Sequence, residues 1–281
     1  MTLRVDERKR TVGYWSARIL LLFLIAATLF PFFLMFYMSV KEGIMIQIDF
    51  WSFPDPIKWQ NYLLVFPKII MPIFTTLWVG FVSVFGTLVL SSLSGYAFGR
   101  HDFIGKNAIF VMFIGVMMIP GILTIVPQYV NIIKLGLLGS YASLILPYMA
   151  GLQLMGILLT RSFYSSLPEE MFEAARMEGA GETYMFLRIA MPLSWPVLVA
   201  IGITSFISIY NDYIWPTLML TSDKQTFTQA IVVLTSPTGQ GGSDYGLITA
   251  GYVIGTIPLL IITMFTFRYY VDGIVEGAIK G

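Results

Sequence analysis

Side chains that could carry out covalent or metal chemistry are scarce in this sequence of 281 residues. It contains one histidine, His101, and no cysteine. The lack of cysteine excludes thiolate metal sites, thiol nucleophiles and disulfides. His101 has no second metal ligand nearby in the sequence, and one histidine with one acid inside an apolar stretch cannot supply a nucleophile, a base and an orienting residue. The sequence therefore predicts no catalytic residue and no metal site, and we do not expect an enzyme.

An energy source is also missing from the sequence. The segment from Gly99 to Lys106 comes nearest to a phosphate-binding loop, but its spacing is wrong and Asn107 follows where Ser or Thr is required. Asp212 is essentially the one ionisable residue within the long apolar stretches, whereas proton-coupled carriers usually keep several. Its place near the outer end of a stretch favours an interfacial or packing role over a proton relay. These features indicate a passage that is driven by another protein.

Acidic residues concentrate in one segment, residues 167–194, which holds five of the sixteen acids. Pro168 and the acids after it favour a helix that begins at Glu169, and Gly179 permits the positive φ that ends a helix. A second short helix is expected over residues 182–189, and Pro192 and Pro196 are expected to break the chain after it. The candidates for the buried side of the first helix are Met171, Phe172, Ala175 and Met177.

A short helical pair of this kind cannot bury its apolar face by itself. We therefore expect it to dock into a groove on another protein. The alternative is a loop folded back on the membrane face, and composition alone does not decide between the two.

The composition of the whole chain indicates the environment in which these segments lie. Hydrophobic residues make up 57% of the chain and charged residues 12%, and the mean hydropathy is +0.77. Soluble domains are nearer 45–50% apolar and about 25% charged. A cytosolic enzyme, a disordered regulator and a secreted disulfide scaffold are excluded, and the net charge of +1 argues against nucleic-acid binding. The sequence predicts an all-α membrane protein that contacts lipid.

A membrane-spanning helix needs about 20 mostly apolar residues. Six stretches qualify, so we expect a single transmembrane domain over residues 1–281. The predicted spans are residues 19–40, 71–98, 108–133, 141–159, 195–220 and 247–267.

The orientation follows from the positive charges, which favour the cytoplasmic side. With the amino terminus in the cytoplasm, twelve of the seventeen Lys and Arg residues, including every arginine, lie on that side. Six spans then return the carboxyl terminus, with a tail over residues 268–281, to the cytoplasm.

The acidic segment carries a specific pattern. Glu173-Ala174-Ala175, Gly179-Ala180, Ile189 and Pro192-Leu193, with these gaps, resemble the EAA loop of ABC importer permeases. Glu178 departs from the sugar branch, which commonly has Asp there. The resemblance covers residues 75–281 and is nearest to the carbohydrate (MalG-like) branch. The further matching segments are Met118-Ile119-Pro120 with Pro127, Leu135-Gly136-Leu137-Leu138, Leu146-Pro147-Tyr148, Asn211-Asp212-Tyr213-Ile214-Trp215-Pro216 and the tail from Arg268 to Gly281.

This resemblance implies a type I ABC importer permease fold and a set of partners. They are a larger, MalF-like second permease, two copies of a cytoplasmic ATPase and an extracytoplasmic solute-binding protein that delivers a sugar. ATP and Mg²⁺ would bind to the ATPase, so no cofactor is expected on this chain. The location implied is the cytoplasmic (inner) membrane of a bacterium or archaeon. The alternatives are an ABC permease for a polyamine, glycerol phosphate or peptide, or a secondary carrier or channel.

The resemblance also implies roles for individual residues. In the segment 167–194, Glu173 would make an ionic contact with the ATPase, Ala174 and Ala175 would allow close approach and Gly179 would form the turn. The full set of predicted coupling residues is Glu173, Ala174, Ala175, Gly179, Ala180, Ile189 and Pro192.

Polar or helix-breaking residues in or near the spans are candidates for the permeation pathway. Simple kinks and interhelical hydrogen bonds explain them equally well. They are Pro120, Gln128, Asn131, Gln153, Ser205, Ser208, Asn211 and Asp212. The Gly95-x-x-x-Gly99 and Gly251-x-x-x-Gly255 patterns are expected to serve close helix packing, and residues 221–245 form a candidate contact for the binding protein or a flexible connector.

Overall fold

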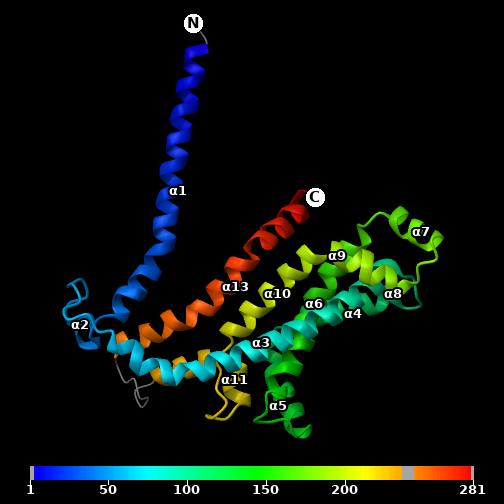
Figure 1. Cartoon of the computed structure of the whole chain (residues 1–281). Coiled ribbons are helices and arrows are strands. Elements are labelled where there is room, and N and C mark those ends of the chain that lie inside the picture. The colour runs from blue at the N-terminus through cyan, green and yellow to red at the C-terminus, as the bar shows by residue number, and fades with distance from the viewer. Residues whose placement is uncertain (1–2, 236–243, 280–281) are drawn as a thin grey trace. The chain divides into compact units, whose positions relative to one another are not determined.

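A computed structural model describes residues 3–235 and 244–279, and the side chains of residues 14–235 and 244–267. Every regular element in these ranges is helical (Figure 1). The α-helices are α1 (Leu3–Ser39), α2 (Gly43–Ile48), α3 (Gln60–Arg100), α4 (Lys106–Met117), α5 (Gly121–Lys134), α6 (Ala142–Ser165), α7 (Glu169–Met177), α8 (Glu182–Met185), α9 (Met191–Leu193), α10 (Trp195–Asn211), α11 (Ile214–Met219), α12 (Phe227–Thr235) and α13 (Tyr245–Ile279), and a π-helix, η1, covers Phe186–Ala190.

The described residues form two compact units. One lies within Met1–Ile69 and Ile231–Thr256, and the other within Ile70–Ala230 and Ile257–Gly281. In the first unit, Lys41 is almost fully buried and its Nζ donates hydrogen bonds to the backbone oxygens of Asp49, Phe50 and Ser52 at 2.7–2.9 Å. Lys41 thus holds the loop over residues 49–52 in place. The second unit contains all of the predicted coupling and pathway residues.

Helices that could cross a membrane match the predicted stretches in part. Four are long and apolar enough alone, over Tyr14–Ser39, Gln60–Arg100, Ala142–Ser165 and Tyr245–Phe267. Two more candidates are bent pairs of helices, and counting each pair as one span brings the total among the described residues to six. The chain is therefore an all-helical protein with several apolar helices of membrane-spanning length.

The predicted span over residues 108–133 is not one straight helix in the structure. It is α4 followed by α5, with a bend of 101° between them. Pro120 stands at the start of α5 with φ −58° and ψ 126°, and proline disfavours helical backbone in the residue before it. Pro127, by contrast, lies inside α5. Of the two prolines that could break this stretch, Pro120 does so.

The predicted span over residues 195–220 is also interrupted. α10 ends at Asn211, Asp212 is extended with ψ 126°, and α11 starts at Ile214. The indole Nε1 of Trp215 donates a hydrogen bond to the backbone oxygen of Ser143 at 3.0 Å, which ties the short α11 to the start of α6. The second bent pair lies earlier in the chain, where the helical run Glu182–Leu193 meets α10 at 70°.

The helices α3 and α6 cross at very short range. A Cβ atom on Gly95 would lie 2.0 Å from Oγ1 of Thr160 and 2.9 Å from the backbone nitrogen of Arg161. One on Gly99 would lie 3.0 Å from Cβ of Tyr164. Thr160 itself donates to the backbone oxygen of Ser91 at 2.8 Å. The predicted packing role of the Gly95-x-x-x-Gly99 pattern is confirmed.

In the first unit, a Cβ on Gly251 would lie 2.8 Å from a methyl group of Ile231. The Gly251-x-x-x-Gly255 pattern thus also serves close packing at its first position.

The α3–α6 crossing predicts that two glycine-to-alanine changes differ in their effect on stability. Gly95→Ala should lower the free energy of unfolding by about 1–3 kcal/mol, because the added methyl group meets backbone as well as a side chain. The matched control is Gly115→Ala in α4, where a Cβ has nothing within 4 Å. Denaturant titration of the purified chain in detergent measures both, and equal stability of the two variants would contradict this packing.

Candidate functional site

The segment 167–194 folds as a hairpin of two helical arms, which we call the cytoplasmic hairpin after its predicted location. Its first arm, α7, begins at Glu169 after Pro168, as predicted. Glu169 and Glu170 occupy the first turn, where the helix dipole favours negative charge. At its end, the backbone N–H of Gly179 donates to Arg176 and that of Ala180 to Ala175, both at 2.9 Å. With Gly179 at φ +82°, this is a Schellman motif, which reverses the chain.

The second arm is one continuous helical run from α8 through η1 to α9. Pro192 lies inside this run, in α9, and Pro196 lies in the first turn of α10, so the break predicted at these two prolines falls between them. The π-helix of residues 186–190 directly precedes α9, and a wider helical register accommodates an interrupted hydrogen-bond ladder. The bend comes at Ser194, which is fully buried and bonds through its hydroxyl to Tyr164 at 2.9 Å.

The hairpin buries one face against its own chain. Phe172 of α7 is completely buried, whereas Met171 and Met177 are exposed, Met177 by 89%. The residues around Phe172 form what we call the hairpin core: Tyr96 of α3, Tyr164 of α6, and Met185, Phe186 and Ala190 of the second arm. The expectation that the hairpin cannot bury an apolar face without a partner is therefore wrong for this face. The hairpin thus packs on its own chain through one face of α7 and leaves the opposite face exposed.

The predicted coupling residues divide between these two faces. Ala175, Ala180 and Ile189 are half-buried and pack against the hairpin core. The others are exposed: Glu173, Ala174, Gly179 and Pro192. Among the described residues, the carboxylate of Glu173 has no ion pair or hydrogen bond, so it is available to a partner.

Charged side chains secure the base of the hairpin. Glu169 pairs with Arg100, the last residue of α3, and at 2.8 Å with Arg176 of α7. The hydrogen bond from Arg176, together with the charge of Arg100, lowers the pKa of the Glu169 carboxyl, and the same bond raises the pKa of Arg176. Both groups thus stay charged at neutral pH. The sequence analysis assigned Arg100 only to the positive charge of the cytoplasmic side and did not single out Tyr96.

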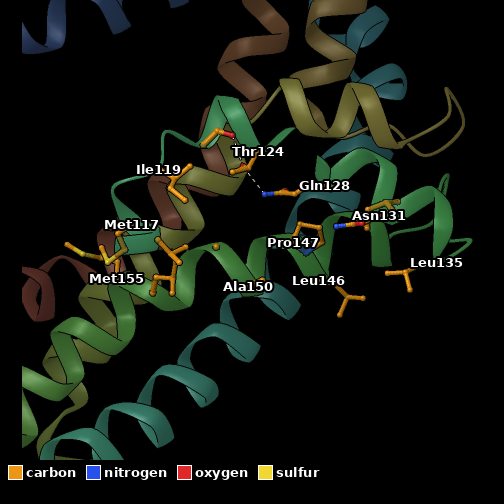
Figure 2. A pocket seen from close by; sticks show the side chains of 15 residues that line it. Met117, Ile119, Thr124, Gln128, Asn131, Leu135, Leu146, Pro147, Ala150 and Met155 are labelled. Atoms are coloured by element: carbon orange, nitrogen blue, oxygen red, sulfur yellow. Dashed lines mark hydrogen bonds between the residues drawn. The ribbon is translucent and has the colours of Figure 1, made fainter. Parts of the chain in front are cut away.

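A pocket of about 650 Å³ lies between α4, α5 and α6 (Figure 2). Figure 1 shows that α5 and the hairpin lie at opposite ends of α6. Among the predicted pathway residues, Gln128 and Asn131 line this pocket, and Pro120 lies between two lining residues, Ile119 and Gly121. Gln128 donates to Oγ1 of Thr124 at 2.9 Å, the bond drawn in Figure 2. Apolar side chains form most of the rest of the wall.

The other pathway candidates do not line this pocket. Gln153 is half-buried in α6, and Ser205 is buried in α10. Ser208 and Asn211 are exposed on α10. Their role in a pathway stays a prediction.

Asp212 has a clear local function. One carboxylate oxygen accepts a hydrogen bond from the hydroxyl of Tyr148 at 2.8 Å. The other accepts the backbone N–H groups of Ile214 at 3.0 Å and Trp215 at 3.3 Å, which caps α11. These hydrogen bonds give Asp212 a role in packing, which the sequence favoured over a role as a proton relay.

Comparison with known proteins shows the family to which this chain belongs. Residues 91–272 match the family described as the binding-protein-dependent transport system inner membrane component, and the chain belongs to this family. The matched region contains the cytoplasmic hairpin, the hairpin core and the pocket. The chain is thus an ABC importer permease subunit.

Two relatives and one solved structure are similar to this chain over most of its length. The arabinooligosaccharides transport system permease protein AraQ of Halalkalibacterium halodurans is 30% identical over 248 residues, covering 86% of this chain and 85% of the relative. The trehalose/maltose transport system permease protein MalG of Thermococcus litoralis is 32% identical over 195 residues, covering 69% and 70%. A chain in the crystal structure of a bacterial ABC transporter involved in the import of alginate has a TM-score of 0.79 at 21% identity, covering 94% of this chain and 98% of that one. This last likeness shows that the folds agree.

The buried face of α7 predicts a local loss of stability in Phe172→Ala. Removing a fully buried phenyl ring should cost about 3–5 kcal/mol, because it leaves a cavity in the hairpin core. Hydrogen exchange of the α7 amides should accelerate accordingly in the purified chain. Met177→Ala, at an exposed position of the same helix, should leave exchange unchanged. Equal protection in both variants would show that the hairpin does not pack on its own chain.

Proposed function

We propose that this chain is one of two permease subunits of an ATP-driven importer for a carbohydrate. The single observation that carries this proposal is the cytoplasmic hairpin, which is anchored on one face and open on the other. The proposal that the cargo is a carbohydrate is supported by the relatives, whose names specify arabinooligosaccharides and trehalose or maltose. The proposed subunits are this chain, a second MalF-like permease, two copies of an ABC ATPase and an extracytoplasmic solute-binding protein.

The proposed topology has six spans in the cytoplasmic membrane of a bacterium or archaeon, with both termini in the cytoplasm. In this arrangement α4 and α5 together count as one span, and the span over residues 195–220 begins with α10, because residues 182–193 belong to the hairpin. The placement of the arginines supports the orientation, and the anchored hairpin supports a cytoplasmic position for residues 167–194. The external side then carries residues 221–245, a surface proposed for the binding protein. The tail over residues 268–281 lies beyond the residues whose side chains are described and is proposed to reach toward the ATPase.

In the proposed mechanism, ATP and Mg²⁺ bind only to the ATPase subunits. Closure of the ATPase pair moves α7, which docks through Glu173, Ala174 and the Gly179 turn. A rigid link is needed to pass this motion to the spans. The hairpin core supplies it, because Phe172 is locked among residues of α3, α6 and the second arm. The spans would then rock around the passage and open it outward.

The pocket beside α5 is the proposed contribution of this chain to the passage. Gln128 and Asn131 offer amide groups to a sugar, and the kink at Pro120 shapes the pocket wall. Among its lining residues there is no charged side chain. This favours a neutral carbohydrate over a phosphate ester, although relatives named as sn-glycerol-3-phosphate permeases are also 29–30% identical to this chain. The uncharged lining is thus the observation on this chain that supports a neutral cargo.

The docking role of the hairpin predicts a loss of transport in Glu173→Lys. Reversing the charge of Glu173, a carboxylate that α7 leaves unpaired on its open face, should reduce ATP-driven uptake at least tenfold, with normal insertion into the membrane. Uptake of labelled sugar by proteoliposomes that contain the co-purified complex measures this. Asp102→Lys is the control, since Asp102 is a fully exposed acid of the cytoplasmic side outside the hairpin. Full transport by Glu173→Lys at normal expression would count against docking.

The topology is testable because the chain has no native cysteine. A single cysteine at Asp223, an external position in this arrangement, should react with a membrane-impermeant maleimide in intact cells. A single cysteine at Asp102 should react only after the cells are permeabilised. The reverse pattern would invert the topology.

A further inference from the structure

We infer that Arg100 is a positioning residue that transmits the movement of the cytoplasmic hairpin directly to α3. Nothing in the sequence pattern of the hairpin includes this residue, since it lies 69 positions before Glu169 in the chain. The inference rests on the proposed docking of α7 to an ATPase and specifies how the displacement leaves the hairpin.

The first observation is the burial of Arg100. Its side chain is 7% exposed, whereas those of its neighbours Glu169, Arg176 and Glu182 are 42–51% exposed. Burying a guanidinium costs free energy, and a well-packed apolar residue in its place is often equally stabilising. Moreover, the Nε of Arg100 is buried with no partner among the described atoms. Stability alone does not explain an arginine here.

The second observation is the set of contacts that this guanidinium makes. One terminal nitrogen donates to the backbone oxygen of Leu167 at 3.2 Å, and the other pairs with the carboxylate of Glu169. The flat face of the group stacks on the ring of Phe172, with Cζ at 3.9 Å from the ring centroid. Arg100 therefore holds the start of α7 at three points. These points span the connection from α6 and the first turn of the helix.

The third observation is a series of side-chain contacts that closes on the end of α3. Glu169 pairs with Arg176, and Arg176 lies 3.9 Å from Glu182 at the start of α8. Glu182 in turn lies 3.4 Å from His101, the residue next to Arg100. This series of contacts thus begins at Arg100 and ends at His101, the next residue in the chain. Both arms of the hairpin are tied to the same point of the chain.

Besides the packing of the hairpin core, two routes connect the hairpin to the spans. The covalent route runs from α7 through Leu167 into α6, and from the second arm through the bend at Ser194 into α10. The Arg100 route runs across space into α3, the longest described helix in this unit. Because the guanidinium engages backbone, carboxylate and ring at once, α7 and the end of α3 move as one body. A push on the open face of α7 then displaces α3 without first bending a loop.

The test uses the complete importer complex in proteoliposomes and measures sugar uptake per ATP hydrolysed. Arg100→Gln should reduce this ratio at least fivefold in complexes that still co-purify with the ATPase. Arg100→Lys keeps the charge but cannot make all three contacts, so it should reduce the ratio at least threefold. Lys106→Gln is the matched control, because it removes an exposed ion pair to Asp102 in the same loop without touching α7. Its ratio should equal that of the wild type.

A second measurement separates transmission from folding. Spin labels on single cysteines at Met177 of α7 and Leu93 of α3, both exposed positions, report the distance between the two helices in the complex. Trapping the ATP-bound state should leave this distance unchanged with Arg100 present and should alter it in Arg100→Lys. This readout also decides the case if Arg100→Gln does not accumulate.

The outcomes distinguish this inference from the proposed function. A wild-type uptake ratio in Arg100→Lys, or a distance that changes on ATP binding with Arg100 present, would overturn the role of Arg100 and leave docking intact. If the wild-type chain itself neither retains the ATPase nor supports ATP-driven uptake, the proposed function fails. A lowered ratio with retained ATPase supports both.

Discussion

The burial of Phe172 is the contact on which the hairpin of this protein depends. Its ring lies among Tyr96, Tyr164 and Phe186, with the guanidinium of Arg100 stacked on it. An apolar core and a buried charge thus hold the same side chain. Because this face of α7 is satisfied within the chain, the opposite face, with Glu173, stays open. The hairpin is therefore held rigidly and exposed at the same time, which a mechanical link between subunits requires.

Features of the fold that depend on local chemistry could be predicted from the sequence. Pro168 and the acids after it mark the start of α7, and Gly179 marks its end through a backbone conformation that favours glycine. The close crossing at Gly95 was likewise readable from spacing. The positions of the bends were not, because Pro120, Pro127 and Pro192 offer the same local chemistry. Pro120 breaks its helix and the other two do not, so packing around each proline decides.

The sequence indicated residues on both faces of the hairpin, with Phe172 and Ala175 among the candidates for the buried side, but not the residues of α3 that cover it. The motif identified Glu173, Ala174 and Gly179, all of which the structure leaves exposed. It said nothing of Tyr96 and Arg100, since their contacts with α7 join residues about seventy positions apart and no sequence period encodes such a pairing. Arg100 was also explained already by the positive charge of the cytoplasmic side, which hid its second role. The position of Phe172, an aromatic residue among glutamates, was a signal in the sequence that part of this helix is buried.

The central claim is that the open face of α7 seats against an ATP-hydrolysing subunit while the other face stays fixed to this chain. A photo-crosslinking amino acid placed at Ala174 in the membrane-embedded complex tests it most directly. The account predicts a covalent product with the ATPase subunit, identified by mass spectrometry. Products with lipid or with this chain alone would contradict it.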